Sequence, residues 1–284
     1  MLINSYFEYY DIFCNFGIIK LTVMFRLYFT ILISFLFICN LQGQVVGGKN
    51  EKLAKLYNSG KYETCLFKAD NLTYKSEYSK DPEPYLYVSM CFYELSKSTN
   101  PVVQEDYKDA FKQAVKYAGK FIKKDKQQGL LPDNIDYINT LKKEQIAVIK
   151  KYYKQDNYRK SVTPAKLYLK LNRDKDLGVM YFIGVCEVLS NNYSQGLRDI
   201  DFAKTGFEES INNGKLKIDS FFKPLTASAF LKYSEYLVTE DKLTEALDNL
   251  ILAKKVFPGN SEFDSEMGII KEKIEIKNDT ARHE

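Results

Sequence analysis

From Glu51 onward, apolar residues recur at spacings of three and four, with polar residues between them. This spacing puts the apolar residues on one face of an α-helix, whereas the strict alternation typical of half-buried strands is scarce. Pro164 falls within a helical pattern, where it should kink the helix or lie in its first turn. The other prolines stand where one helical pattern gives way to the next: Pro82, Pro84, Pro101, Pro132, Pro224 and Pro258. The pattern predicts an all-α domain over residues 44–284.

A combination of small and bulky residues recurs within this helical pattern. It is clearest in residues 227–258, where Ser234 is small, the bulky Leu243 follows a turn, Ala246 and Ala253 lie in the second helix, and Pro258 closes the unit. The same frame fits four other stretches less completely. Their members are Gly184, Tyr193, Gly196 and Ala203; Asp156, Asn157, Tyr158, Ser161 and Ala165; Gly60, Tyr62 and Cys65; and Tyr107, Ala110 and Tyr117.

These residue types and spacings resemble the tetratricopeptide repeat family, in which helix pairs of about 34 residues repeat along the chain. The resemblance implies a right-handed superhelical solenoid of about five antiparallel helix pairs, with residues 261–277 as a capping helix. Tyr158 and Tyr193, which are 35 residues apart, keep close to that period. The other separations are longer and predict longer helices or connections, such as the run 132–155. In such a pair, small residues let the two helices approach and bulky residues fill the space near the turn.

The resemblance also implies that the first helices of successive pairs line a concave groove. Carried over residue by residue, the groove candidates are Lys150, Tyr153, Lys154, Tyr181, Val185, Val188, Leu231, Glu235 and Val238. A groove of tyrosine, lysine and aliphatic side chains would suit an extended peptide or a helix of a partner. The alternative is that the apolar members pack against neighbouring helices and the lysines are ordinary solvated residues.

The beginning of the chain reads as a leader. Residues 27–39 form an apolar run behind Lys20 and Arg26, and the small Gly43 stands at the exit. A basic start, a short apolar stretch and a small residue describe a secretory signal peptide. We therefore assign residues 1–43 to an N-terminal extension and signal peptide, with Met24 as an alternative start and export to the periplasm or cell envelope. A lipid-modified Cys39 or a retained anchor are the alternatives, and either would be the chain's only tie to a membrane.

Charge and composition narrow the classes of partner. Charged residues make up 27% of the chain, yet the net charge is only +4, and the basic residues are almost all lysine. This is a mixed, solvated surface rather than the single-sign field of a nucleic-acid reader. We expect no nucleic acid as partner, and instead another envelope protein or a peptide.

Catalytic side chains are few. The one histidine, His283, stands next to the C-terminus, so histidine-dependent catalysis and histidine metal sites are not expected. Cys65 and Cys91 lie on consecutive predicted helices, where they either form a disulfide or act as small buried apolar residues, and Cys186 is left over. No CxxC pair and no glycine-rich phosphate loop occurs. The sequence therefore predicts a protein that binds no metal or cofactor and is not an enzyme.

Three functions follow from these features. The first is an exported interaction module or scaffold that binds a peptide or partner protein through the concave helical groove. The second is carbohydrate or small-ligand binding on the same face, for which the sequence offers tyrosine but no tryptophan. The third is a helical lytic enzyme, which would need a catalytic glutamate in a deep cleft.

Overall fold

The computed structural model describes residue 45 and residues 47–283, with side chains as far as residue 280. The expected leader, the alternative start at Met24 and the alternative lipidation at Cys39 all lie outside the described residues. Residues 45–284 group into one compact unit. None of its described helices combines the length and the apolar character needed to cross a membrane.

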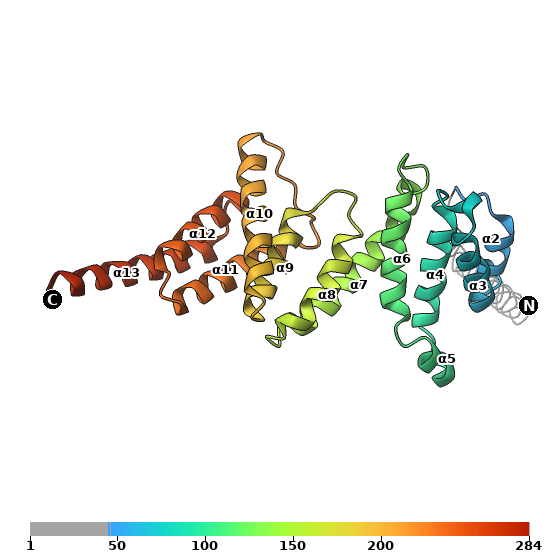
Figure 1. Ribbon diagram of the computed structural model, residues 1–284, viewed down its shortest axis with the longest axis horizontal. Coiled ribbons are helices and arrows are strands. Elements are labelled where there is room, and N and C mark those ends of the chain that lie inside the picture. Colours follow the sequence, from blue (N-terminus) through green and yellow to red (C-terminus); the bar gives the residue numbers. More distant parts are fainter. Residues whose placement is uncertain (1–44, 46, 284) are drawn as a thin grey trace, which may run out of the picture. The chain divides into compact units, whose positions relative to one another are not determined.

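The described residues are all-α, as the pattern predicts, and contain no strand (Figure 1). Two short 3-10 helices, Ser76–Tyr78 and Pro132–Asn134, lie in the connections. The α-helices are α2 (Glu51–Asn58), α3 (Tyr62–Thr73), α4 (Glu83–Ser96), α5 (Pro101–Asp106), α6 (Ala110–Lys124), α7 (Ile135–Tyr153), α8 (Tyr158–Leu169), α9 (Leu177–Leu189), α10 (Tyr193–Asn212), α11 (Lys223–Thr239), α12 (Leu243–Val256) and α13 (Ser261–His283).

Six prolines stand at helix boundaries, as predicted, and Pro164 does not. Pro101 and Pro224 occupy the first turns of α5 and α11, where a missing backbone N–H costs nothing. Pro164 lies in the interior of α8 rather than in its first turn. Its carbonyl accepts a buried hydrogen bond of 2.8 Å from Nε2 of Gln145 on α7, which ties the two helices of this pair together.

One turn geometry joins four helix pairs: α2 with α3, α7 with α8, α9 with α10, and α11 with α12. At its centre a residue adopts the left-handed backbone conformation, with φ of 71° at Gly60, 53° at Asp156, 66° at Asn191 and 60° at Asp241. The next residue's N–H bonds to the carbonyl five residues earlier, at 2.8–3.0 Å in all four turns. This is the Schellman arrangement, which satisfies the last carbonyls of a helix and stops it.

The bulky residues of the recurring pattern mark where the second helices begin. Tyr62, Tyr158, Tyr193 and Leu243 are the first residues of α3, α8, α10 and α12. Tyr107 behaves differently, which corrects the weakest of the five copies. It ends the short α5, which is inserted between α4 and α6, and α6 begins only at Ala110. The loop that carries Pro101 therefore forms a helix of its own, and α4 pairs with α6 across it.

Small residues lie where paired helices cross. In the α9–α10 pair, a Cβ atom added to Gly196 would lie 2.7 Å from the Gly184 carbonyl oxygen, and one added to Gly184 would lie 2.9 Å from the Gly196 oxygen. In the α11–α12 pair, the buried Ser234 hydroxyl donates to the Ala246 carbonyl at 3.4 Å. The pairing of small residues read from the sequence therefore describes the close approach of these helices.

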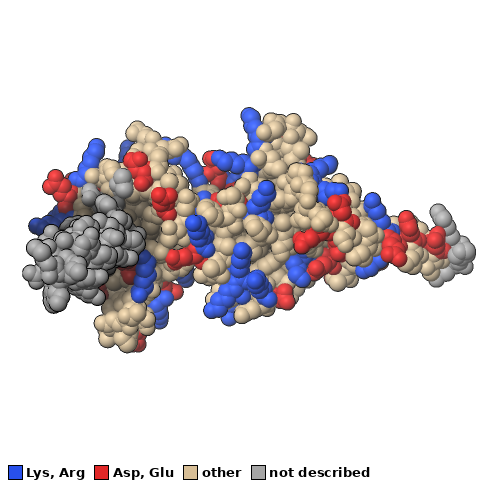
Figure 2. Space-filling view, turned by 180° about the vertical axis from the view of Figure 1, so that it is seen from behind, with Lys and Arg blue, Asp and Glu red and all other residues tan. Residues whose placement is uncertain are grey.

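The apolar core falls into two clusters, and α7 belongs to both. Ile138 and Leu141, in its first half, pack with residues of α2–α6. Ile146, Ile149 and Tyr153, in its second half, pack with residues of α8–α13. On the surface, basic and acidic side chains are interspersed over the face drawn in Figure 2, as the small net charge suggests.

Candidate binding site

The side chains of α9 that were expected to line a groove are buried. Tyr181 and Val185 are fully buried, Val188 is 1% exposed and Tyr153 of α7 is 7% exposed. The Tyr181 ring stacks on Phe230 of α11 with centroids 4.0 Å apart, and its hydroxyl donates to Asn249 of α12 at 2.7 Å. The prediction that these four side chains line an open surface is therefore wrong, and the alternative, packing against neighbouring helices, holds for them.

The physical reason is that α9 has neighbours on every side. It packs against α8, α10 and α11 (Figure 1), and ten of its thirteen residues are buried. Contacts from α7 reach the segment that leads into α11: Lys142 Nζ lies 2.6 Å from the Asp219 carboxylate, and Lys143 lies 5.7 Å from the Phe221 ring centroid. Burial of the Tyr153 and Tyr181 rings also removes the aromatic platform that a carbohydrate on this face would need.

The other groove candidates remain at the surface. Lys154 and Glu235 are exposed, while Lys150, Leu231 and Val238 are half-buried. Glu235 pairs with Lys232 on its own helix at 2.8 Å. These five residues lie on α11 and at the C-terminal end of α7, and no open inner face of α9 joins them, although the groove required one.

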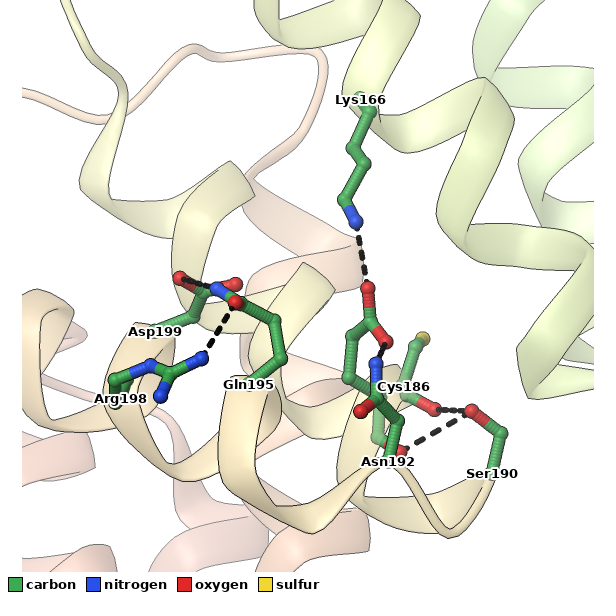
Figure 3. A network of polar contacts seen from close by, with 8 residues as sticks. Lys166, Cys186, Ser190, Asn192, Gln195, Arg198 and Asp199 are labelled. Atoms are coloured by element: carbon green, nitrogen blue, oxygen red, sulfur yellow. Dashed lines mark hydrogen bonds and ion pairs between the residues drawn. The ribbon is translucent and has the colours of Figure 1, made fainter.

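Figure 3 shows a polar network at the α9–α10 turn whose members are paired with one another. The Glu187 carboxylate is buried, accepts from Lys166 of α8 at 2.6 Å, and also accepts from the Asn192 side chain. The Ser190 hydroxyl donates to the Cys186 carbonyl at 2.7 Å. The network ties α8 to this turn, so we interpret it as structural.

Cys65 of α3 and Cys91 of α4 are both buried, and the Cys65 thiol donates to the Leu53 carbonyl at 3.6 Å. Both are free thiols in the structure, so the disulfide stays a prediction. Cys186 is buried as well, and burial raises the pKa of its thiol well above the ordinary value. A protonated thiol without access to solvent is a poor nucleophile, which argues against catalysis by Cys186.

Two adjoining hollows, of about 490 and 400 Å³, lie where α6, α7 and the loops before α9 and α11 meet. Asn172 and Arg173 line both hollows, and we call the combined feature the basic cleft. Three aspartates line it: Asp174, Asp176 and Asp219. Its cationic residues are Lys123, Lys126, Lys142, Lys170, Arg173, Lys175, Lys215 and Lys217.

Two of the three aspartates are already occupied by structural contacts. Asp176 caps α9 by accepting from the Val179 N–H at 2.9 Å, and it also accepts from the Asp219 N–H at 2.7 Å. Burial raises the pKa of Asp176 above its ordinary value, although these hydrogen bonds oppose the shift. Asp219 pairs with Lys142. The cleft therefore keeps a surplus of positive charge.

One of the positive charges, that of Arg173, stabilises the fold. Arg173 donates to the carbonyls of Asp125, at 3.4 Å, and Lys126, at the end of α6, where a cation favours the helix dipole. Lys123, Lys126, Lys170, Lys215 and Lys217 are exposed and form no ion pair with any residue that the structure describes.

Asn172 adds a donor to the cleft. Its side-chain nitrogen is buried and has no acceptor among the described residues. A buried donor without a partner is costly, and a ligand oxygen would satisfy it once the Asn172 side chain turns toward the hollow that the residue lines. With lysines at the rim and an amide donor within, the cleft is suited to carboxylates or other anionic oxygens.

Sequence reasoning missed the basic cleft because its residues come from four separate segments. The only local signals are the short runs 123–126 and 170–175, each of which holds several cations. Neither is a recognised motif, and Lys215 and Lys217 join them only through the fold.

Neither metal-ligating residues nor the comparisons with known proteins point to a function for this chain. Among the described residues, no three histidine, cysteine, aspartate or glutamate side chains gather closely enough to hold a metal ion. No protein-family model matches the chain. No curated protein matches it either.

Proposed function

We propose that this chain is an exported helical-repeat module of the tetratricopeptide type, working in the periplasm or cell envelope as a scaffold for another protein. The four helix pairs with one shared turn support this proposal, since stacked helix pairs commonly serve as binding surfaces. We also propose that the pairs follow the right-handed superhelix of that family. No chemistry of its own is assigned to the chain.

The partner surface in this proposal is the basic cleft rather than the inner face of α9. The observation that carries it is the group of unpaired lysines around the buried, unpartnered amide of Asn172. The two hollows have the volume of typical ligand pockets, which is about 300–1,000 Å³. The ligand that fits is a short acidic segment of a partner protein, whose carboxylates would form charge-assisted hydrogen bonds to the lysines.

The test uses a fluorescein-labelled glutamate-rich peptide and the described domain, with binding followed by fluorescence anisotropy. The cleft variant carries Lys123→Glu, Lys170→Glu and Lys215→Glu, three exposed residues without ion pairs. The matched control carries Lys52→Glu, Lys112→Glu and Lys255→Glu, three exposed lysines that do not line the cleft. Both variants change the net charge equally, so a non-specific charge effect would appear in both.

We expect the cleft variant to bind at least about tenfold more weakly than wild type, with the control close to wild type. Binding should also weaken with added salt, because rim charges are screened. An equal loss of peptide binding in both variants would show that the peptide binds a diffuse basic surface rather than the cleft. Absence of binding to wild type, together with no partner recovered from intact cells, would count against the scaffold itself.

A further inference from the structure

The last helix, α13, keeps one apolar stripe that none of the residues described in the structure covers. Ile269 is 46% exposed and Ile276 is 60% exposed, and the seven-residue spacing places both on one side of the helix. Glu272 and Lys273 lie between them on the same side, and Ser265 and Thr280 continue it at either end. We call these six residues, all of them exposed, the outer stripe of α13.

The outer stripe is not needed to hold α13 in place. A different side of the helix carries Phe263 and Ile270, both fully buried in the core. Two ion pairs also hold α13 in place. Lys254 of α12 pairs with Asp264, and Asp241, in the turn between α11 and α12, pairs with Lys277. The fold therefore accounts for the inner side of α13, and among the described residues the outer stripe has no partner.

The outer stripe is complementary to itself when a second copy runs antiparallel. A two-fold axis between positions 272 and 273 brings Ile269 of one copy opposite Ile276 of the other, and places Ser265 opposite Thr280. The same axis brings Glu272 opposite Lys273 twice, so both central contacts join opposite charges. A parallel arrangement in register would instead place Glu272 opposite Glu272.

We infer that α13 is a self-association helix through which two copies of this chain pair antiparallel. The contact is isologous, so it closes after two copies and does not build a fibre. Since a single helix face is smaller than the ~1,200 Å² of a standard interface, the dimer is weak and forms at high protein concentration. This inference does not depend on what the basic cleft binds.

The test is analytical ultracentrifugation of the described domain over a range of concentrations. Glu272→Lys places lysine opposite lysine at both central contacts, and Lys273→Glu places glutamate opposite glutamate. We expect each variant alone to weaken dimerisation at least about tenfold. A mixture of the two variants should recover association, because every central contact then joins opposite charges.

A second variant, Ile269→Ser with Ile276→Ser, removes the apolar part of the outer stripe and should also abolish the dimer. Its control is Val102→Ser, which removes an apolar side chain of α5 that is 66% exposed. Circular dichroism verifies that the variants remain folded, as expected for exposed positions. A wild type that stays monomeric at every concentration would overturn the inference, and so would a dimer that the charge variants and their mixture leave unchanged.

Discussion

At the scale of single residues, the close approach of α9 and α10 depends on two glycines. Gly184 and Gly196 face each other where α9 crosses α10, and each carbonyl oxygen occupies the space that a Cβ on the other would need. An added methyl would also meet backbone nitrogen atoms, Ile200 N for Gly184 and Val188 N for Gly196, which cannot rotate away as a side chain can. The packing of α9 thus depends on the absence of two side chains.

Gly196→Ala should therefore destabilise the domain by about 1–3 kcal/mol, even though alanine favours helix more than glycine does. The matched control is Gly268→Ala in α13, where an added Cβ would meet nothing within 4 Å. There we expect a gain of up to about 1 kcal/mol from helix propensity alone. Chemical denaturation of both variants measures the two effects. A Gly196→Ala variant as stable as wild type would contradict the close approach.

At the scale of elements, the unit that repeats is the turn as much as the helix. Its left-handed position is occupied once by glycine, twice by aspartate and once by asparagine, the residues that tolerate this conformation best. In two turns that side chain also accepts from a tyrosine hydroxyl two residues on: Asp156 from Tyr158, and Asn191 from Tyr193 at 2.8 Å. A short polar residue followed by a helix-starting tyrosine is therefore a signal that the sequence carries by itself.

Gly60 allows this turn to be tested without steric interference, because nothing lies within 4 Å of an added Cβ. Gly60→Ala should cost about 1–2 kcal/mol, since alanine is strained at a φ of 71°. Gly60→Asn should cost less, because asparagine tolerates this conformation and resembles the Asn191 turn. Thermal unfolding of wild type and the two variants measures their relative stability. If alanine proved no worse than asparagine, the backbone conformation would not be what selects glycine there.

At the scale of the whole domain, local pattern predicts the helices and long-range contact decides the site. The starts of α3, α8, α10 and α12 could be predicted from turn residues that are neighbours in sequence. The burial of Tyr181 and Val185 could not, because it depends on contacts such as Tyr181 to Asn249, 68 residues apart. The basic cleft escaped prediction for the same reason, since Lys123, Lys170 and Lys215 meet only after folding. The prediction that Tyr107 begins a second helix was wrong because α5, which it ends, has no counterpart in the other pairs.

The many buried tyrosines predict how stability depends on pH. Burial raises the pKa of Tyr57, Tyr87, Tyr168 and Tyr181 above the ordinary value of 10.0. The folded state thus keeps protons that the unfolded state loses, so these residues contribute stability that is intact below pH 10.0 and is lost as the pH rises above it. The loss approaches about 1.4 kcal/mol per tyrosine for each pH unit.

We therefore expect cooperative alkaline unfolding, in which tyrosinate absorbance and loss of helical circular dichroism appear together above pH 10.0. Chain unfolded in denaturant is the reference, and its tyrosines should titrate near pH 10.0. Buried tyrosines that ionised near that same value, with the helices still intact, would contradict the assignment.

The enclosure of α9 has a consequence for how this chain can change over evolution. Repeat arrays with open faces are lengthened or trimmed by whole units, because each unit touches only its neighbours. Here, losing the α11–α12 pair would strip Phe230 and Asn249 from Tyr181 and expose the most apolar helix of the domain to water. We therefore expect the second half of the chain to be gained or lost only as a block.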